Sequence, residues 1–77
     1  MEIQQFIEKF ASIFDDVDVS TLSAATKFKT LEGWSSLVAL SVIAFVDEEY
    51  GVAIKGKDIR EAETIEDLFN AVKALKS

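Results

Sequence analysis

The chain of 77 residues contains no cysteine and no histidine. Disulfide bonds, protein thiols, histidine general bases and the usual zinc ligands are therefore excluded. Proline is also absent, which favours unbroken helices. No apolar run reaches the roughly 18 residues of a membrane span, and the acidic, amphipathic N-terminus is unlike a signal peptide. We therefore expect a cytoplasmic protein with no membrane span.

Basic residues are scarce in this sequence. Eight Lys and Arg residues stand against 14 Asp and Glu residues, which gives a net charge of −6. Binding to nucleic acid needs a basic face, so we expect no nucleic-acid partner. An acidic surface instead favours association with basic protein partners. The length predicts a single domain over residues 1–77, which we expect to be a monomer.

The spacing of apolar residues predicts an all-α fold, a small four-helix bundle with three longer helices, one short helix and a long first loop. The first helix is expected over residues 2–14, with Phe14 on its apolar stripe, and the second over residues 36–50. Gly51 supplies a C-terminal stop for the second helix.

The C-terminal part of the chain predicts the two remaining helices. A short helix is expected over residues 57–61, with Ile59 and Ala62 turned inward. Thr64 opens the last helix, and Asp67 three residues later makes a variant of the capping box. The buried stripe of this helix is expected to consist of Ile65, Leu68, Phe69, Val72 and Leu75.

The connection over residues 16–34 is long for a loop in so small a domain, and its apolar residues predict that it packs on the bundle. Ser20 or Thr21 is expected to cap a helical turn over residues 22–25. Gly33 gives the backbone freedom for a sharp turn into the second helix.

The sequence offers weak candidates for metal binding or catalysis. Asp16-Val17-Asp18 resembles the start of a calcium loop, but Thr21 and Lys27 occupy the later positions that need Gly and Glu. The carboxylates of Asp47-Glu48-Glu49 point in different directions on a helix. A serine nucleophile would need a base, and without histidine only a Ser–Lys arrangement is left open. We expect no metal site, no catalytic residue and no enzyme.

Ser35 and Ser36 follow Gly33-Trp34 at the start of a second helix that is apolar almost all round. A domain of this size cannot bury such a helix on every side, so part of its surface is expected to be a partner face. One of the two serines is expected to cap the helix, which leaves the other free.

The stretch from Ser35-Ser36-Leu37 to Asp47-Glu48-Glu49-Tyr50-Gly51 resembles the signature of the acyl carrier protein family without a gap. Phe28, Ile54 and the Thr64-Ile65 helix start also fit, so the resemblance covers nearly the whole chain. It implies that Ser36 receives 4′-phosphopantetheine from coenzyme A through a holo-carrier-protein synthase, a phosphopantetheinyl transferase. It also implies that acyl-processing enzymes then use the acyl thioesters on this arm, in fatty acid biosynthesis.

Two departures from the family pattern are informative. Ser35 stands where the family has Asp, and Val38 and Ser41 stand at positions that are often acidic. The resemblance implies that partners bind at Ser35, Leu37, Val38, Ser41, Ala44, Asp47 and Glu48. Two alternatives stay open: a carrier for a polyketide, peptide, aminoacyl or surface-polymer pathway, and a carrier-like interaction module that is never modified.

Overall fold

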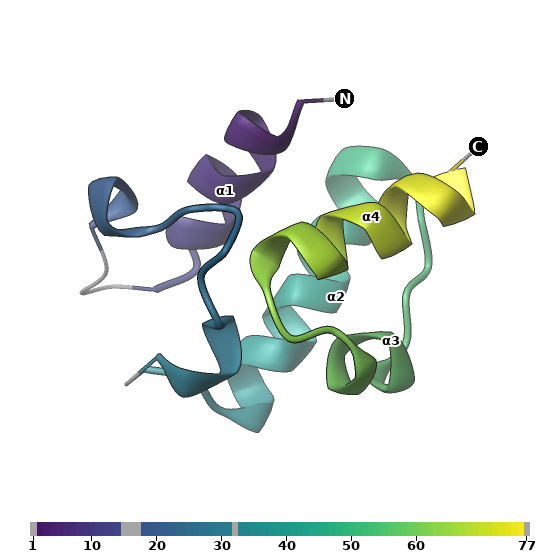
Figure 1. Cartoon of the computed structure of the whole chain (residues 1–77). Helices are drawn as coiled ribbons and strands as arrows, with labels where there is room; N and C mark the ends of the chain where they lie inside the picture. Colours follow the sequence, from purple (N-terminus) through teal and green to yellow (C-terminus); the bar gives the residue numbers. More distant parts are fainter. Residues whose placement is uncertain (1, 15–17, 32, 77) are drawn as a thin grey trace.

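The computed structural model describes residues 2–14, 18–31 and 33–76. Within these ranges the chain forms helices and turns and no strand (Figure 1). The α-helices are α1 (Ile3–Ala11), α2 (Ser36–Tyr50), α3 (Gly56–Glu61) and α4 (Ile65–Lys76), and two 3₁₀ turns, η1 (Val19–Thr21) and η2 (Phe28–Thr30), lie in the first connection. The predicted all-α fold, with three longer helices and one short helix, is confirmed.

The core of the bundle is drawn from every helix and from the first connection. α1 contacts α4, and α3 contacts both α2 and α4. No polar side chain is buried in the part of the chain that is described. The buried side chains are therefore apolar, and their removal from water is the main force that holds the bundle together. The largest fully buried side chains are Phe6, Phe10, Phe28, Val42, Val46, Ile65, Leu68 and Val72.

α2 begins and ends where the sequence predicts. Ser35 precedes the helix with an extended backbone, and its Oγ accepts a hydrogen bond of 3.3 Å from the Val38 N–H. Gly51 ends the helix in the left-handed conformation, with φ at 67°, which residues other than glycine rarely adopt. The two cap residues therefore fix both ends of α2.

The predicted end of the first helix is wrong, because α1 stops at Ala11 and not at Phe14. Phe14 is nevertheless buried. Its ring packs against the far end of the connection, where a Cβ added to Gly33 would lie only 3.2 Å from it. Gly33 does not have a positive φ, so the turn before α2 does not use the special backbone freedom predicted for it; the close approach of the Phe14 ring is what favours glycine there. Gly51 is the glycine with positive φ among the described residues.

The predicted turn over residues 22–25 is also wrong. The first 3₁₀ turn is η1, and it is capped by neither Ser20 nor Thr21: the Asp18 carboxylate accepts a hydrogen bond of 2.9 Å from the Ser20 N–H. The connection does pack on the bundle as predicted, because Leu22 and Phe28 are buried. Asp16 and Val17 of the rejected calcium loop lie outside the described residues.

The C-terminal helices follow the prediction with two corrections. α3 starts at Gly56, one residue early, and Ile59 and Ala62 are buried as expected. The capping box of α4 is confirmed, since the Asp67 N–H donates to Thr64 Oγ1 at 3.1 Å and the Thr64 N–H donates to the Asp67 carboxylate at 3.2 Å. The predicted burial of Leu75 is wrong: its side chain is 55% exposed, and every described position in the last turn of α4 is exposed, so no neighbouring element covers this turn.

Candidate functional site

The first connection, although long, is fastened to the C-terminal helices. The Ile65 N–H donates to the Thr26 carbonyl at 3.1 Å, and the Glu66 N–H donates to the Ala24 carbonyl at 2.9 Å. The Lys29 ammonium donates to the Arg60 carbonyl at 2.8 Å, near the end of α3. The bond from Lys29 holds η2 beside α3, and the other two hold the preceding residues against the start of α4. Together they position the residues that lead into α2.

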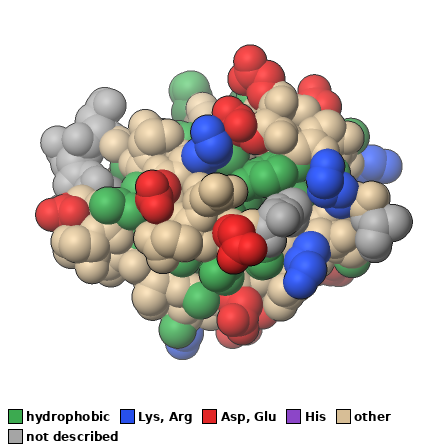
Figure 2. Space-filling view, turned by 90° about the horizontal axis from the view of Figure 1, so that it is seen from above, with side chains coloured by type: hydrophobic (Ala, Val, Ile, Leu, Met, Phe, Trp, Pro, Cys, Tyr) green, Lys and Arg blue, Asp and Glu red, His purple; other side chains and the backbone are tan. Residues whose placement is uncertain are grey.

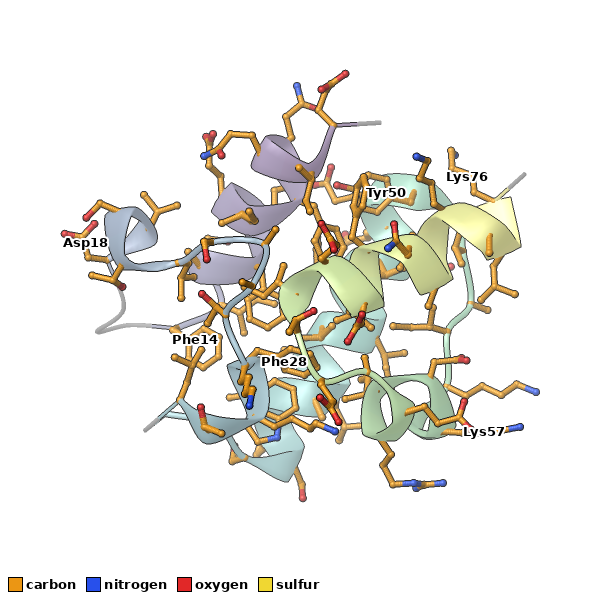
Figure 3. All side chains as sticks on the ribbon, viewed as in Figure 1. Phe14, Asp18, Phe28, Tyr50, Lys57 and Lys76 are labelled. Atoms are coloured by element: carbon orange, nitrogen blue, oxygen red, sulfur yellow. The ribbon has the colours of Figure 1, made fainter. Side chains whose placement is uncertain are left out.

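An aromatic cluster fixes Trp34, two residues before Ser36. The Trp34 ring meets the Phe28 ring edge-on with centroids 5.1 Å apart, and it lies parallel to the Phe10 ring at 6.5 Å. Phe14 adds a tilted contact, also at 6.5 Å. Figure 3 shows Phe28 on the side of the connection that faces α2 and α3. The start of α2 is therefore anchored by packing as well as by its cap.

The two adjacent serines have different roles. Ser35 Oγ is occupied by the Val38 N–H, as the cap of α2. Ser36 is exposed at the first position of the helix, and its hydroxyl has no hydrogen-bond partner among the described residues. Ser36 therefore presents a free hydroxyl at a helix N-terminus, where unpaired N–H groups and the helix dipole favour an anion.

The residues predicted to bind partners lie mostly along one outward stripe of α2, which we call the outer face. Leu37 is 69% exposed, and Ser41, Ala44, Asp47 and Glu48 are exposed as well. Val38 is only half-buried and contacts the core. The structure adds Leu40, which was not among the predicted partner-binding residues and is 65% exposed. The outer face is thus apolar at its N-terminal end and acidic at its C-terminal end.

A groove of about 620 Å³ lies between the start of α2, η2 and α3, and we call it the α2–α3 groove. Both serines line this groove, whose surface is largely apolar. Its lining consists of Lys29, Trp34, Ser35, Ser36, Ala39, Leu40, Ile43, Gly56, Ile59 and Arg60.

Lys29 and Arg60 were not predicted as site residues. They are 31 positions apart and share no motif, and only the folded connection brings them to the same groove. The single ion pair found among the described residues joins Lys9 to Glu49, away from the groove. On the face seen in Figure 2, Lys and Arg side chains are interspersed with acidic and hydrophobic ones and form no continuous basic surface.

A Ser–Lys nucleophile is not assembled in this groove. The Lys29 ammonium donates to the Arg60 carbonyl, and no hydrogen bond joins it to Ser35 or Ser36 in the described structure. Activation of a serine needs such a contact with a base. Across residues 2–14, 18–31 and 33–76, no group of acidic side chains could hold a metal ion. Within the same ranges, no helix is both long enough and apolar enough to cross a membrane.

Neither the comparison with protein-family models nor the comparison with curated proteins finds a match for this chain.

Proposed function

We propose that this protein is an acyl carrier and that Ser36 is the attachment point for 4′-phosphopantetheine. The observation that carries the proposal is the division of roles between the two serines. Ser35 is used as the helix cap, whereas Ser36 is exposed, has no described hydrogen-bond partner and lies at an apolar groove. The resemblance of residues 35–51 to the carrier signature supports the same position.

The residues around Ser36 fit a phosphodiester. The first turn of α2 contains no acidic side chain that would repel it. The free N–H groups of that turn and the positive end of the helix dipole favour a negative charge there. The α2–α3 groove offers room of about 620 Å³ beside the attachment point for an apolar group. An acyl chain has the chemistry to occupy such a groove.

In this proposal the chain supplies the hydroxyl and the partner enzyme supplies the catalysis. Ser36 Oγ forms a bond to the phosphorus that bears the pantetheine in coenzyme A. The phosphoanhydride bond breaks, adenosine 3′,5′-bisphosphate leaves, and the hydroxyl proton passes to a base of the transferase. Once attached, the arm supplies the thiol for acyl thioesters, which this chain of 77 residues without cysteine cannot supply itself.

The outer face of α2 is the proposed docking surface for the transferase and for acyl-processing enzymes. Leu37 is exposed at its N-terminal end, while Asp47 and Glu48 keep an acidic end. Apolar contact depends little on ionic strength, whereas long-range attraction between charges is screened by salt. We therefore propose that salt weakens partner binding less than it would for a carrier that is acidic along the whole helix. Fatty acid biosynthesis in the cytoplasm is the proposed setting.

Intact mass spectrometry tests the attachment directly. The protein is incubated with coenzyme A and a broad-specificity phosphopantetheinyl transferase, and we expect one phosphopantetheine adduct. Ser36→Ala should abolish the adduct, while the matched variant Ser35→Ala should keep it. A wild-type chain that stays unmodified would favour the interaction module without an arm. An adduct that survives in Ser36→Ala would move the site, with Ser35 the first residue to examine.

A further inference from the structure

The α2–α3 groove differs in charge from the rest of the molecule. The chain has a net charge of −6, yet the described residues that line the groove include two cations and no carboxylate. Ser35 adds no negative charge at the entrance to α2, and the first turn of the helix has none either. The charged side chains among the described lining residues are therefore both positive, on a protein that is acidic as a whole.

The two cations, Lys29 and Arg60, come from different elements but are held together. Lys29 is half-buried, and its ammonium is fixed by a hydrogen bond of 2.8 Å to the Arg60 carbonyl. The Arg60 guanidinium is exposed, and within the described ranges it has no ion-pair or hydrogen-bond partner. A guanidinium is well suited to bind phosphate oxygens, and the ammonium retains two further N–H donors.

We propose that Lys29 and Arg60 bind the phosphodiester of an arm attached at Ser36, and that they hold the arm along the α2–α3 groove and not in solvent. This inference rests on the proposed function. Attachment would place the phosphate on Ser36 Oγ, and Ser36 lines the same groove as the two cations. No other anion is guaranteed a position at this groove.

The apolar part of the groove accounts for the rest of the arm. Leu40 and Ile43 from α2, with Ile59 from α3, form a surface over which an extended chain with apolar segments can lie. Leu40 is 65% exposed, so covering it removes apolar surface from water. The cations fix one end of the arm and the apolar wall shelters the remainder. Partner enzymes must then draw the arm out of the groove before they can use its thiol.

The reaction rate of the arm's thiol measures how far the groove protects the arm from solvent. Because the chain contains no cysteine, the arm carries the only thiol, and its alkylation reports on the arm alone. Protein is first loaded with the transferase, and the adduct is verified by intact mass. The rate of reaction with N-ethylmaleimide, an uncharged reagent, is then compared with that of free pantetheine. We expect the wild-type protein to react about threefold to tenfold more slowly, as two exposed ion pairs allow.

Charge-neutral variants separate the phosphate contact from general effects. Arg60→Gln should raise the alkylation rate about threefold, and it keeps the Lys29 hydrogen bond because the acceptor is a backbone carbonyl. Lys29→Gln should raise the rate at least as much. The matched control is Lys57→Gln, since Lys57 also lies on α3 but projects away from the molecule (Figure 3) and does not line the groove. High salt should accelerate the wild-type reaction more than that of Arg60→Gln.

The outcomes distinguish the two proposals. If the wild-type chain acquires no adduct, the proposed function is overturned, and the proposal for Lys29 and Arg60 falls with it. If the adduct forms but all three variants and the wild type react at the rate of free pantetheine, only the proposal for Lys29 and Arg60 is overturned. The same holds if Lys57→Gln accelerates alkylation as much as Arg60→Gln, because the effect is then one of net charge.

Leu40→Ser tests the apolar wall of the groove. It should accelerate alkylation to the same extent at low and high salt, because it removes an apolar contact and no charge.

Discussion

The N-termini of α4 and α2 are built in opposite ways. At α4, the Ile65 and Glu66 N–H groups donate to carbonyls of the first connection, and the Asp67 N–H donates to Thr64 Oγ1. Glu66 and Asp67 also place two acidic residues in its first turn. At α2, the Ser35 hydroxyl accepts one hydrogen bond of 3.3 Å, and no acidic residue follows in the first turn.

This difference shows which helix start is available to a ligand. The protein's own groups satisfy the N–H donors and the dipole of α4, so its N-terminus is purely structural. The α2 N-terminus keeps donors that have no partner among the described residues, beside an exposed hydroxyl and a groove with two cations. An external anion is the group that would complete it.

The largest expected difference between the two helix starts is the loss of stability when an apolar side chain in the first turn of α4 or of α2 is truncated. Ile65 is fully buried, and Ile65→Ala should lower the free energy of unfolding by about 2–5 kcal/mol because it leaves a cavity. Leu37 is 69% exposed, and Leu37→Ala should change the same quantity by less than about 0.5 kcal/mol while weakening transferase binding. Urea unfolding measures both. A large stability loss in Leu37→Ala would mean that the outer face is covered in solution.

A smaller effect is expected from completing the α2 N-terminus. Attachment of phosphopantetheine at Ser36 should raise the free energy of unfolding by about 0.3–1 kcal/mol, because the phosphate interacts with the helix dipole. Ser35→Asp should reduce this gain, since its carboxylate already meets the dipole, and should change the rate of modification by the transferase. Urea unfolding of modified and unmodified protein, at low and high salt, measures the gain. Equal stability of both forms would show that the α2 N-terminus is already satisfied.

The smallest effect is confined to acid pH and belongs to α4. The Glu63 N–H, followed by the Thr64 N–H, lowers the pKa of the Asp67 carboxyl from its ordinary value of 3.8. The charged carboxylate therefore stabilises the fold at pH values above 3.8, and this contribution is lost as the pH falls through the lowered pKa. The stability difference between wild type and Asp67→Asn should shrink as acid is added. Unfolding experiments at several pH values test this, and a constant difference would contradict it.

Most of the helical framework could be predicted from the sequence. α2 was predicted to the residue, because a serine cap and a C-terminal glycine are local signals. The end of α1 was missed because Phe14 keeps the helical spacing although the backbone has already left the helix. Its burial depends on Gly33 and Trp34, which lie about 20 positions away and give no local signal.

The site was predictable only where it is local. The two serines and the outer face of α2 follow from one continuous stretch of sequence. The groove cations do not, because Lys29 and Arg60 meet only after the first connection has folded against α3. The prediction that Leu75 is buried failed for a related reason. Periodicity indicates which side of α4 is apolar, but not where the neighbouring elements that would cover it end.

The hydrogen bonds from Ile65 and Glu66 to the first connection link two segments about 40 positions apart. Both amide protons are shielded by acceptors that lie outside α4. They can exchange with solvent only when the connection lifts away, whether or not the rest of α4 stays helical. The rate of deuterium uptake at these two amides therefore reports how often the segment that carries Lys29 and leads into Ser36 opens.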